Sequence, residues 1–153
     1  MGEQSSEHPY GRAEQLTEGP FAGWWTWGRG ADPYETTIGP FCFTMENGRT
    51  RSAFMPRREH LNGSGAVHGG ALMSFADFAL FSIAHNALAN NVKAVTLTCN
   101  CEFLSAGTLD GGIVGAEGEV LRDTRSLVFV RGLVTQASRP VLAFSGTLKK
   151  IGM

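Results

Sequence analysis

Charge of either sign is scarce in this chain, and neither sign dominates. Only 18% of its 153 residues are charged, and the formal net charge is −1. No run of lysine and arginine is present, so nothing in the sequence supplies the basic face that nucleic acid or an anionic membrane surface requires. We therefore expect neither partner. The length corresponds to a single domain.

Cysteine is scarce as well, with only Cys42, Cys99 and Cys101. There is no Cys-x-x-Cys pair and no Cys/His cluster, so we predict no metal site and no cofactor. Cys99 and Cys101 are two residues apart on an expected strand, where their Cα atoms would lie about 6.6 Å apart, near the limit for a disulfide. Free thiols in a reducing cytosol explain all three. The polar, acidic residues 1–7 do not resemble a signal peptide, so we expect a cytoplasmic protein.

Long apolar runs are absent except for one, which begins at Gly69 and extends to the polar pair Asn90 and Asn91. Apolar residues fall on every side of this stretch, which is typical of a buried helix. It is too short for a convincing membrane span, which needs roughly 20 apolar residues. Its one acid before that pair is Asp77. A buried acid is rare unless it is paired or has a function.

A glycine-rich loop leads into this helix, and the first turn is Gly69-Gly70-Ala71. The first backbone N–H groups of a helix have no internal partner, and the macrodipole makes that end electropositive. Glycine lets a ligand oxygen approach the backbone closely. The turn therefore has the chemistry of an oxyanion hole. The simpler interpretation is that the glycines only allow a tight turn, and that Asp77 is only a paired structural acid.

Together these residues resemble the hotdog-fold thioesterases, within them the phenylacetyl-CoA-thioesterase-like (PaaI-like) branch. The match is Asn62, then His68-Gly69-Gly70 six residues later, and Asp77 fifteen residues after Asn62. The strand expected over residues 94–100 and the turn over 103–107 resemble the segments that follow in that family. The resemblance covers about residues 38–151.

The resemblance implies hydrolysis of acyl-CoA thioesters by a homodimer or a homotetramer built from dimers. Asp77 would be the general base or nucleophile, and the Gly69 N–H, with Gly70 beside it, would bind the thioester. Asn62 and His68 would position the thioester or the attacking water, and Thr96 would hold that water. Arginines in loops are candidates for the CoA phosphates, with solvated charge as the simpler interpretation for each: Arg57, Arg58, Arg122 and Arg125.

The hydrophobic pattern, taken alone, predicts an α+β fold. Two strands at 40–46 and 50–56 precede the helix, and four follow at 95–103, 109–121, 126–137 and 140–150. Strands that follow one another without helices between them should be antiparallel. In the first strand after the helix, strict alternation predicts that Val95, Leu97, Cys99, Cys101 and Phe103 share one face. The resemblance gives the same architecture, a long central helix wrapped by an antiparallel sheet of about six strands.

Residues 1–37 are predicted to form an N-terminal segment ahead of a thioesterase domain at 38–153. We expect its first 20 residues to be polar and frayed, with a short helix at 13–18. The aromatic-rich stretch 21–43 either covers the core or forms a wall of the acyl pocket.

The spacing along the helix predicts a second chain. Gly69 and Asp77 are eight residues apart, which is about 12 Å at ~1.5 Å per residue. A base and an oxyanion donor that act on one carbonyl must each lie about 3 Å from a reacting atom. One helix cannot easily supply both, whereas two antiparallel copies can.

Three alternatives stay open at this stage. A non-catalytic acyl-CoA-binding protein could use the same fold. A hotdog hydratase or dehydratase is expected to carry an Asn-Pro-x-His loop, but no proline occurs between Glu59 and Gly63. An interaction scaffold would have no need of Asp77.

Overall fold

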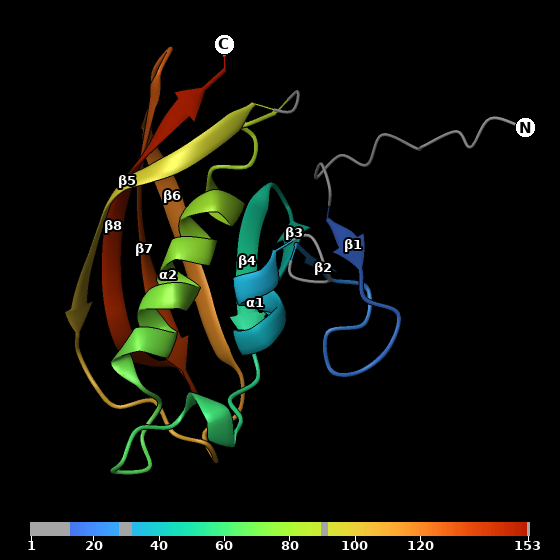
Figure 1. The fold of residues 1–153 in the computed structure, drawn as a ribbon, viewed down its shortest axis with the longest axis vertical. Helices are drawn as coiled ribbons and strands as arrows, with labels where there is room; N and C mark the ends of the chain where they lie inside the picture. Colours follow the sequence, from blue (N-terminus) through green and yellow to red (C-terminus); the bar gives the residue numbers. More distant parts are fainter. Residues whose placement is uncertain (1–12, 28–31, 90–91, 153) are drawn as a thin grey trace, which may run out of the picture.

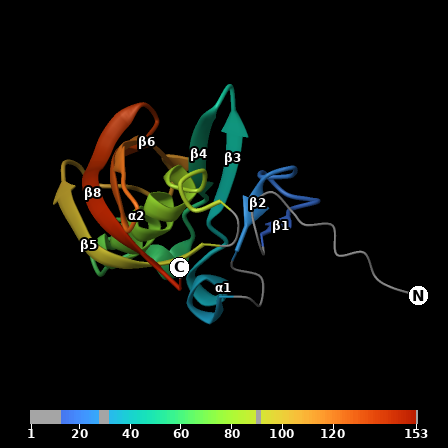
Figure 2. The ribbon, with the colours of Figure 1, turned by 90° about the horizontal axis from the view of Figure 1, so that it is seen from above.

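A computed structural model describes residues 13–27, 32–89 and 92–152. One long helix lies in the concave face of a curved sheet, which wraps around it (Figures 1 and 2). The helices are α1 (Pro33–Ile38), the 3₁₀ turn η1 (Arg58–His60) and α2 (Gly69–Ile83). The strands are β1 (Glu14–Gln15), β2 (Trp25–Thr26), β3 (Cys42–Glu46), β4 (Arg49–Phe54), β5 (Lys93–Phe103), β6 (Val114–Asp123), β7 (Leu127–Gln136) and β8 (Arg139–Ile151).

The sheet has eight strands in the order β1-β2-β3-β4-β6-β7-β8-β5, and every neighbouring pair is antiparallel. The six expected strands correspond to β3–β8, so the predicted α+β architecture is confirmed. The two additional strands have two residues each and extend the β3 edge through the pair Trp25 and Phe43. The helix expected at 13–18 was wrong, because Glu14 and Gln15 pair with β2 instead.

Two other boundaries differ from expectation. β6 begins at Val114 rather than 109 and continues through Arg122 and Asp123, which pair with β7. The turn before β8 contains only Ala137 and Ser138, both at positive φ.

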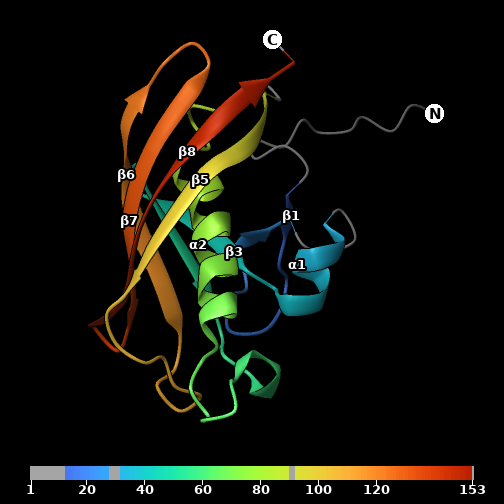
Figure 3. The ribbon, with the colours of Figure 1, turned by 60° about the vertical axis from the view of Figure 1, so that its left-hand side comes forward.

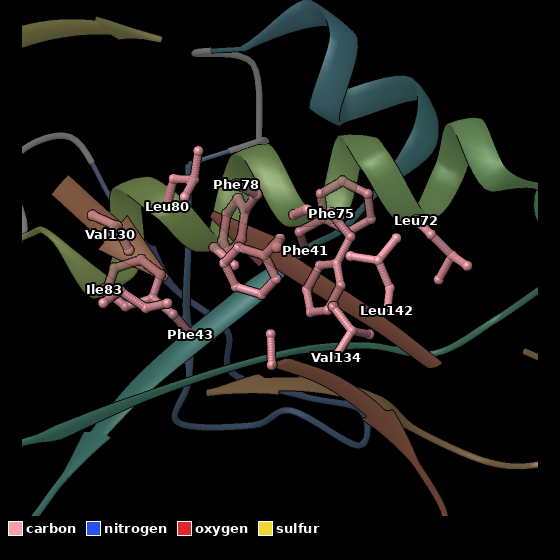
Figure 4. Close-up of a cluster of buried hydrophobic side chains, with 14 of the residues drawn as sticks. Phe41, Phe43, Leu72, Phe75, Phe78, Leu80, Ile83, Val130, Val134 and Leu142 are labelled. Atoms are coloured by element: carbon pink, nitrogen blue, oxygen red, sulfur yellow. The ribbon is translucent and has the colours of Figure 1, made fainter. Parts of the chain in front are cut away.

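The core lies between α2 and the sheet (Figure 4). Phe75, Phe78 and Leu80 of α2 are at most 2% exposed, and Phe75 packs edge-on against Phe54 with ring centroids 4.9 Å apart. The helix ends at Ile83, well before the predicted 91, and is followed by turns up to residue 89. The polar pair Asn90 and Asn91 lies outside the described residues. Among the described helices, none is long and apolar enough to cross a membrane.

A β-bulge interrupts β5 between Thr96 and Thr98. These two residues pair with residues of β8 that are adjacent in sequence, so the residue between them has no partner in β8. The bulge reverses the alternation, so Val95 and Leu97 are exposed (42% and 52%) while Cys99 and Cys101 pack against the core. The prediction that all five alternating residues share one apolar face was therefore wrong. The shift turns Thr96 toward α2, where its hydroxyl reaches Asp77.

Candidate active site

Asp77 lies in the middle of α2 and faces β5. The Thr96 hydroxyl donates a hydrogen bond of 2.7 Å to Asp77 Oδ1. The family resemblance predicted that Thr96 holds the attacking water, and that role stays a prediction. The structure shows a direct contact between Thr96 and Asp77. It depends on the β5 bulge, because an unbroken alternation with Cys99 and Cys101 inward would turn Thr96 to the other face.

A pocket of about 370 Å³ opens beside Asp77. Its walls combine three acids, two hydroxyl side chains, an aromatic ring and two sulfur side chains: Asp32, Glu35, Asp77, Tyr34, Ser74, Phe41, Met73 and Cys99. Burial raises the pKa of the Cys99 thiol to about 12, so it stays protonated and is a poor nucleophile. Among the described cysteines all thiols are free. Asp77 is therefore the only group in this pocket, of those predicted from the sequence, that can attack or activate water.

The start of α2 presents an unused backbone donor and an unused side-chain donor. The Gly70 N–H donates to His68 Nδ1 at 2.8 Å, which makes His68 the N-cap of the helix. Within the described part of the chain the Gly69 N–H makes no hydrogen bond. The His68 Nδ1 acts as an acceptor, so the neutral ring carries its proton on Nε2. Gly69 N–H and His68 Nε2–H are thus the donors available at this end.

Both glycines also have packing reasons to be glycine. A Cβ on Gly69 would lie 3.2 Å from the Phe103 ring, and one on Gly70 would lie 3.0 Å from His68 Nδ1. Packing thus gives each glycine a structural role, although neither has a positive φ. It does not account for the unpaired N–H of Gly69.

Asn62 organises the loop rather than pointing at Asp77. Its Oδ1 accepts hydrogen bonds from the backbone N–H groups of Ser64 (2.9 Å) and Ala66 (3.1 Å), and its side chain is exposed. The loop is tied down further by the His68 N–H, which donates to His60 O. Asn62 thus holds the approach to the helix start in place.

The four arginines fall into two pairs at opposite ends of the molecule. Arg57 and Arg58 lie at η1, beside the start of α2, whereas Arg122 and Arg125 belong to the β6–β7 hairpin at the other end (Figure 3). Arg57 also holds α1, because its guanidinium donates to Thr37 O at 2.7 Å. One chain cannot bring all four to a single ligand.

The contribution of α1 to this pocket was not predicted from the sequence. Tyr34 and Glu35 of this helix line the Asp77 pocket. The Ser74 hydroxyl donates to Gly70 O at 2.8 Å, so the Tyr34 hydroxyl is the donor in the 2.7 Å bond to Ser74. Part of the aromatic-rich segment covers the core, since Trp27 stacks on Phe43 at 4.3 Å, and its Tyr34 and Phe41 line the pocket beside Asp77. The signal was available, because Asp32 followed by Pro33 is a typical helix start.

The family model described as the thioesterase superfamily matches residues 64–143, which include the helix start, Asp77 and Thr96. Solved structures with a similar fold include the PaaI protein from the Escherichia coli phenylacetic acid degradation operon. It is 23% identical, with a TM-score of 0.66 over 79% of this chain and 86% of that one. The hotdog fold expected from the sequence is thereby confirmed.

Two other structures of this kind were determined with coenzyme A. A Bacillus halodurans protein is 21% identical, with a TM-score of 0.68 over 77% of this chain and 76% of that one. A hypothetical thioesterase from Streptococcus pneumoniae is 23% identical, with a TM-score of 0.63 over 74% and 87%. No curated protein sequence matches the chain.

Proposed function

The chain belongs to the thioesterase superfamily, and from this we propose that it hydrolyses acyl-CoA thioesters to a free acid and CoA. The observation that carries the proposal is Asp77, held by the Thr96 hydroxyl at 2.7 Å beside a pocket of about 370 Å³. A carboxylate in this setting can act as a general base or as a nucleophile. The relatives determined with coenzyme A support CoA as the thiol part of the substrate.

We place each active site between two chains. Gly69 and Asp77 both lie on the continuous helix α2, so the separation of about 12 Å holds within one chain. β5 forms one edge of the sheet and exposes Val95, Leu97 and Phe103. A long edge strand with exposed apolar side chains favours pairing with another strand. The proposed partner is β5 of a second copy.

The contacts along β5 favour an antiparallel pair. Thr96, near one end of the strand, holds Asp77, and Phe103, at the other end, lies against Gly69. Antiparallel pairing centred near Asn100 therefore brings Thr96 of one chain opposite Phe103 of the other. The Asp77 of each chain then approaches the Gly69 N–H of its partner. The same pairing brings Arg57 and Arg58 toward the hairpin end of the partner, where CoA phosphates can be bound.

The proposed reaction begins when the Gly69 N–H of one chain donates a hydrogen bond to the thioester carbonyl. Asp77 of the other chain takes a proton from water, whose oxygen attacks the carbonyl carbon, or Asp77 attacks directly and forms an anhydride that water then opens. The oxyanion collapses, the carbon–sulfur bond breaks, and CoA leaves as the thiolate. His68 Nε2–H and the loop held by Asn62 are proposed to position the thioester.

A panel of aliphatic and aromatic acyl-CoA esters, assayed for thiol release, tests the proposal. The wild-type protein should release CoA thiol, and the Asp77→Asn variant should be far slower. A control variant, Glu119→Gln, removes an exposed acid that pairs with Arg131 away from the site and should retain activity. A protein that binds acyl-CoA esters without releasing thiol from any of them would instead be the non-catalytic binding protein.

A further inference from the structure

A second acid shares the pocket with Asp77. Glu35 reaches it from α1, a helix fixed to the rest of the chain at several points. The Tyr34 hydroxyl binds Ser74 of α2, and at the C-terminal end of α1 the His60 Nε2–H donates to Ile38 O at 2.6 Å. The Arg57 guanidinium donates to Thr37 O. The position of Glu35 is therefore part of the folded structure.

The Glu35 carboxyl has an unused oxygen. Glu35 Oε2 is enclosed and forms no hydrogen bond, although a buried polar atom without a partner is costly. Burial, then Asp32, then Asp77 raise the pKa of Glu35 to about 8. The other titratable groups near it, Cys42 and Cys99, have raised pKa values and are neutral thiols. At neutral pH Glu35 is thus mostly a protonated carboxyl, which can both donate and accept a hydrogen bond.

We propose that Glu35 is a specificity-determining residue, which hydrogen-bonds a neutral polar group on the acyl part of the substrate. The inference rests on the proposed function for the identity of the ligand. Its own basis is the enclosed oxygen of Glu35 in the pocket where Asp77 would meet the thioester. Glu35 Oε2 has almost no exposed surface, so the carboxyl must turn into the pocket for a hydroxyl or carbonyl group on the acyl chain to supply the missing partner.

The same pocket selects against some acyl groups. Its volume of about 370 Å³ is near the lower end of the ~300–1,000 Å³ range of ligand pockets, which favours a compact acyl group over a long chain. Asp32 and Asp77 line the pocket beside the protonated Glu35, and a carboxylate on the acyl group would be repelled by the carboxylates of these two aspartates. The substrate class is therefore compact acyl groups that carry a hydroxyl or carbonyl group, and not those that end in a carboxylate such as succinyl.

Binding of non-hydrolysable analogues tests this inference separately from catalysis. The probes are acyl-CoA analogues with a methylene group in place of the thioester sulfur, in pairs that differ by one hydroxyl: phenylacetyl with 4-hydroxyphenylacetyl, and butyryl with 3-hydroxybutyryl. For at least one pair, calorimetry should show wild-type protein binding the hydroxylated member about three- to tenfold more tightly. The succinyl analogue should bind more weakly than the butyryl one.

Two variants of Glu35 and one control decide the outcome. Glu35→Gln keeps a neutral donor and acceptor and should keep the preference, whereas Glu35→Leu should abolish it while binding the plain analogue as well as wild type does. Glu119→Leu, the exposed control, should behave as wild type. An equal preference in the Leu variant and wild type, or no preference in wild type for either pair, overturns the inference. Failure to release thiol from any ester overturns only the proposed function, since these affinities do not depend on turnover.

Discussion

Replacing Gly69 with proline should remove the proposed oxyanion donor and leave the helix intact. Gly69 is the first residue of α2, a position where proline is favoured because its missing N–H has no partner in the helix. The residue before it, His68, has φ −59° and ψ 137°. Such an extended ψ is what a residue before proline adopts. The substitution therefore replaces the N–H of the proposed reaction by a ring carbon without requiring a change of backbone.

The expected loss is large because the donor is preorganised. Removing one oxyanion-hole donor typically lowers kcat by about 10²–10³, which is about 2.7–4 kcal/mol. A steric contribution must be separated from it, since any Cβ at Gly69 meets the Phe103 ring at 3.2 Å. Phe103 is 53% exposed in the single chain, but in the proposed dimer it lies against the partner's β5. Gly69→Ala makes the same contact but keeps the N–H, so the ratio of the alanine to the proline variant isolates the donor.

Thiol release from an acyl-CoA that the wild-type protein hydrolyses gives kcat for all three proteins, and thermal unfolding verifies that the variants are folded. The alanine variant should stay within about tenfold of wild type, because its close contact is confined to one side chain. The proline variant should be lower by a further 10²-fold or more. Two folded variants with the same kcat would refute the role of the Gly69 N–H.

Four other predictions follow from the site. Asp77→Asn should lower kcat by about 10²–10⁴ and leave the melting temperature near that of wild type, and near-normal turnover would make Asp77 structural. Thr96→Val should lower kcat by about 10–100-fold, because a hydrogen bond to a carboxylate contributes about 1.5–3 kcal/mol. A loss as large as that of Asp77→Asn would mean that Thr96 does more than hold Asp77. Mixing the Asp77→Asn and Gly69→Pro proteins should restore activity to about a quarter of all sites. Half the dimers are then mixed, and each mixed dimer has one intact site. If mass measurements confirm subunit exchange and activity does not rise, a shared site is excluded. Glu35→Gln should change how stability depends on pH, because the folded state holds the Glu35 proton up to about pH 8. As the pH rises from about 4.5 to 8, wild type should therefore lose stability relative to the variant. If the melting temperatures of the two proteins change in parallel from pH 4 to 9, Glu35 is not enclosed in solution.

The sequence predicted the main parts of the fold because its strongest periodic signals are local. The apolar stretch around Phe75 and Leu80 and the six strands β3–β8 were identified, whereas the two-residue strands β1 and β2 were not. Thr96 was singled out, but only as a residue that holds water. The β5 bulge was not predictable from alternation, because neither Leu97 nor its neighbours is a glycine that marks an irregularity. The bulge is set by the pairing with β8, which is a tertiary property.

The helix end and the loop show the same limit. Apolar residues continue after Ile83, so hydrophobicity alone does not show where α2 stops. The Ser82 hydroxyl donates to Ala79 O in the last turn, and Ala84 caps the helix through its N–H. Asn62 was assigned to substrate because of the family motif, yet its Oδ1 is occupied by its own loop. Side-chain to backbone bonds of this kind are not visible in residue spacing.

The attachment of α1 has a consequence for how such a protein can diversify. The groups proposed to break the thioester lie on α2 and β5, whereas Glu35 and Tyr34 come from a short helix that precedes the sheet strands β3 and β4 in the chain. With the roles proposed above, substitutions in α1 can alter which acyl groups are accepted while the residues proposed to perform hydrolysis are inherited unchanged. After a gene duplication, copies of such a chain can acquire new substrates through a six-residue segment, without passing through an inactive ancestor.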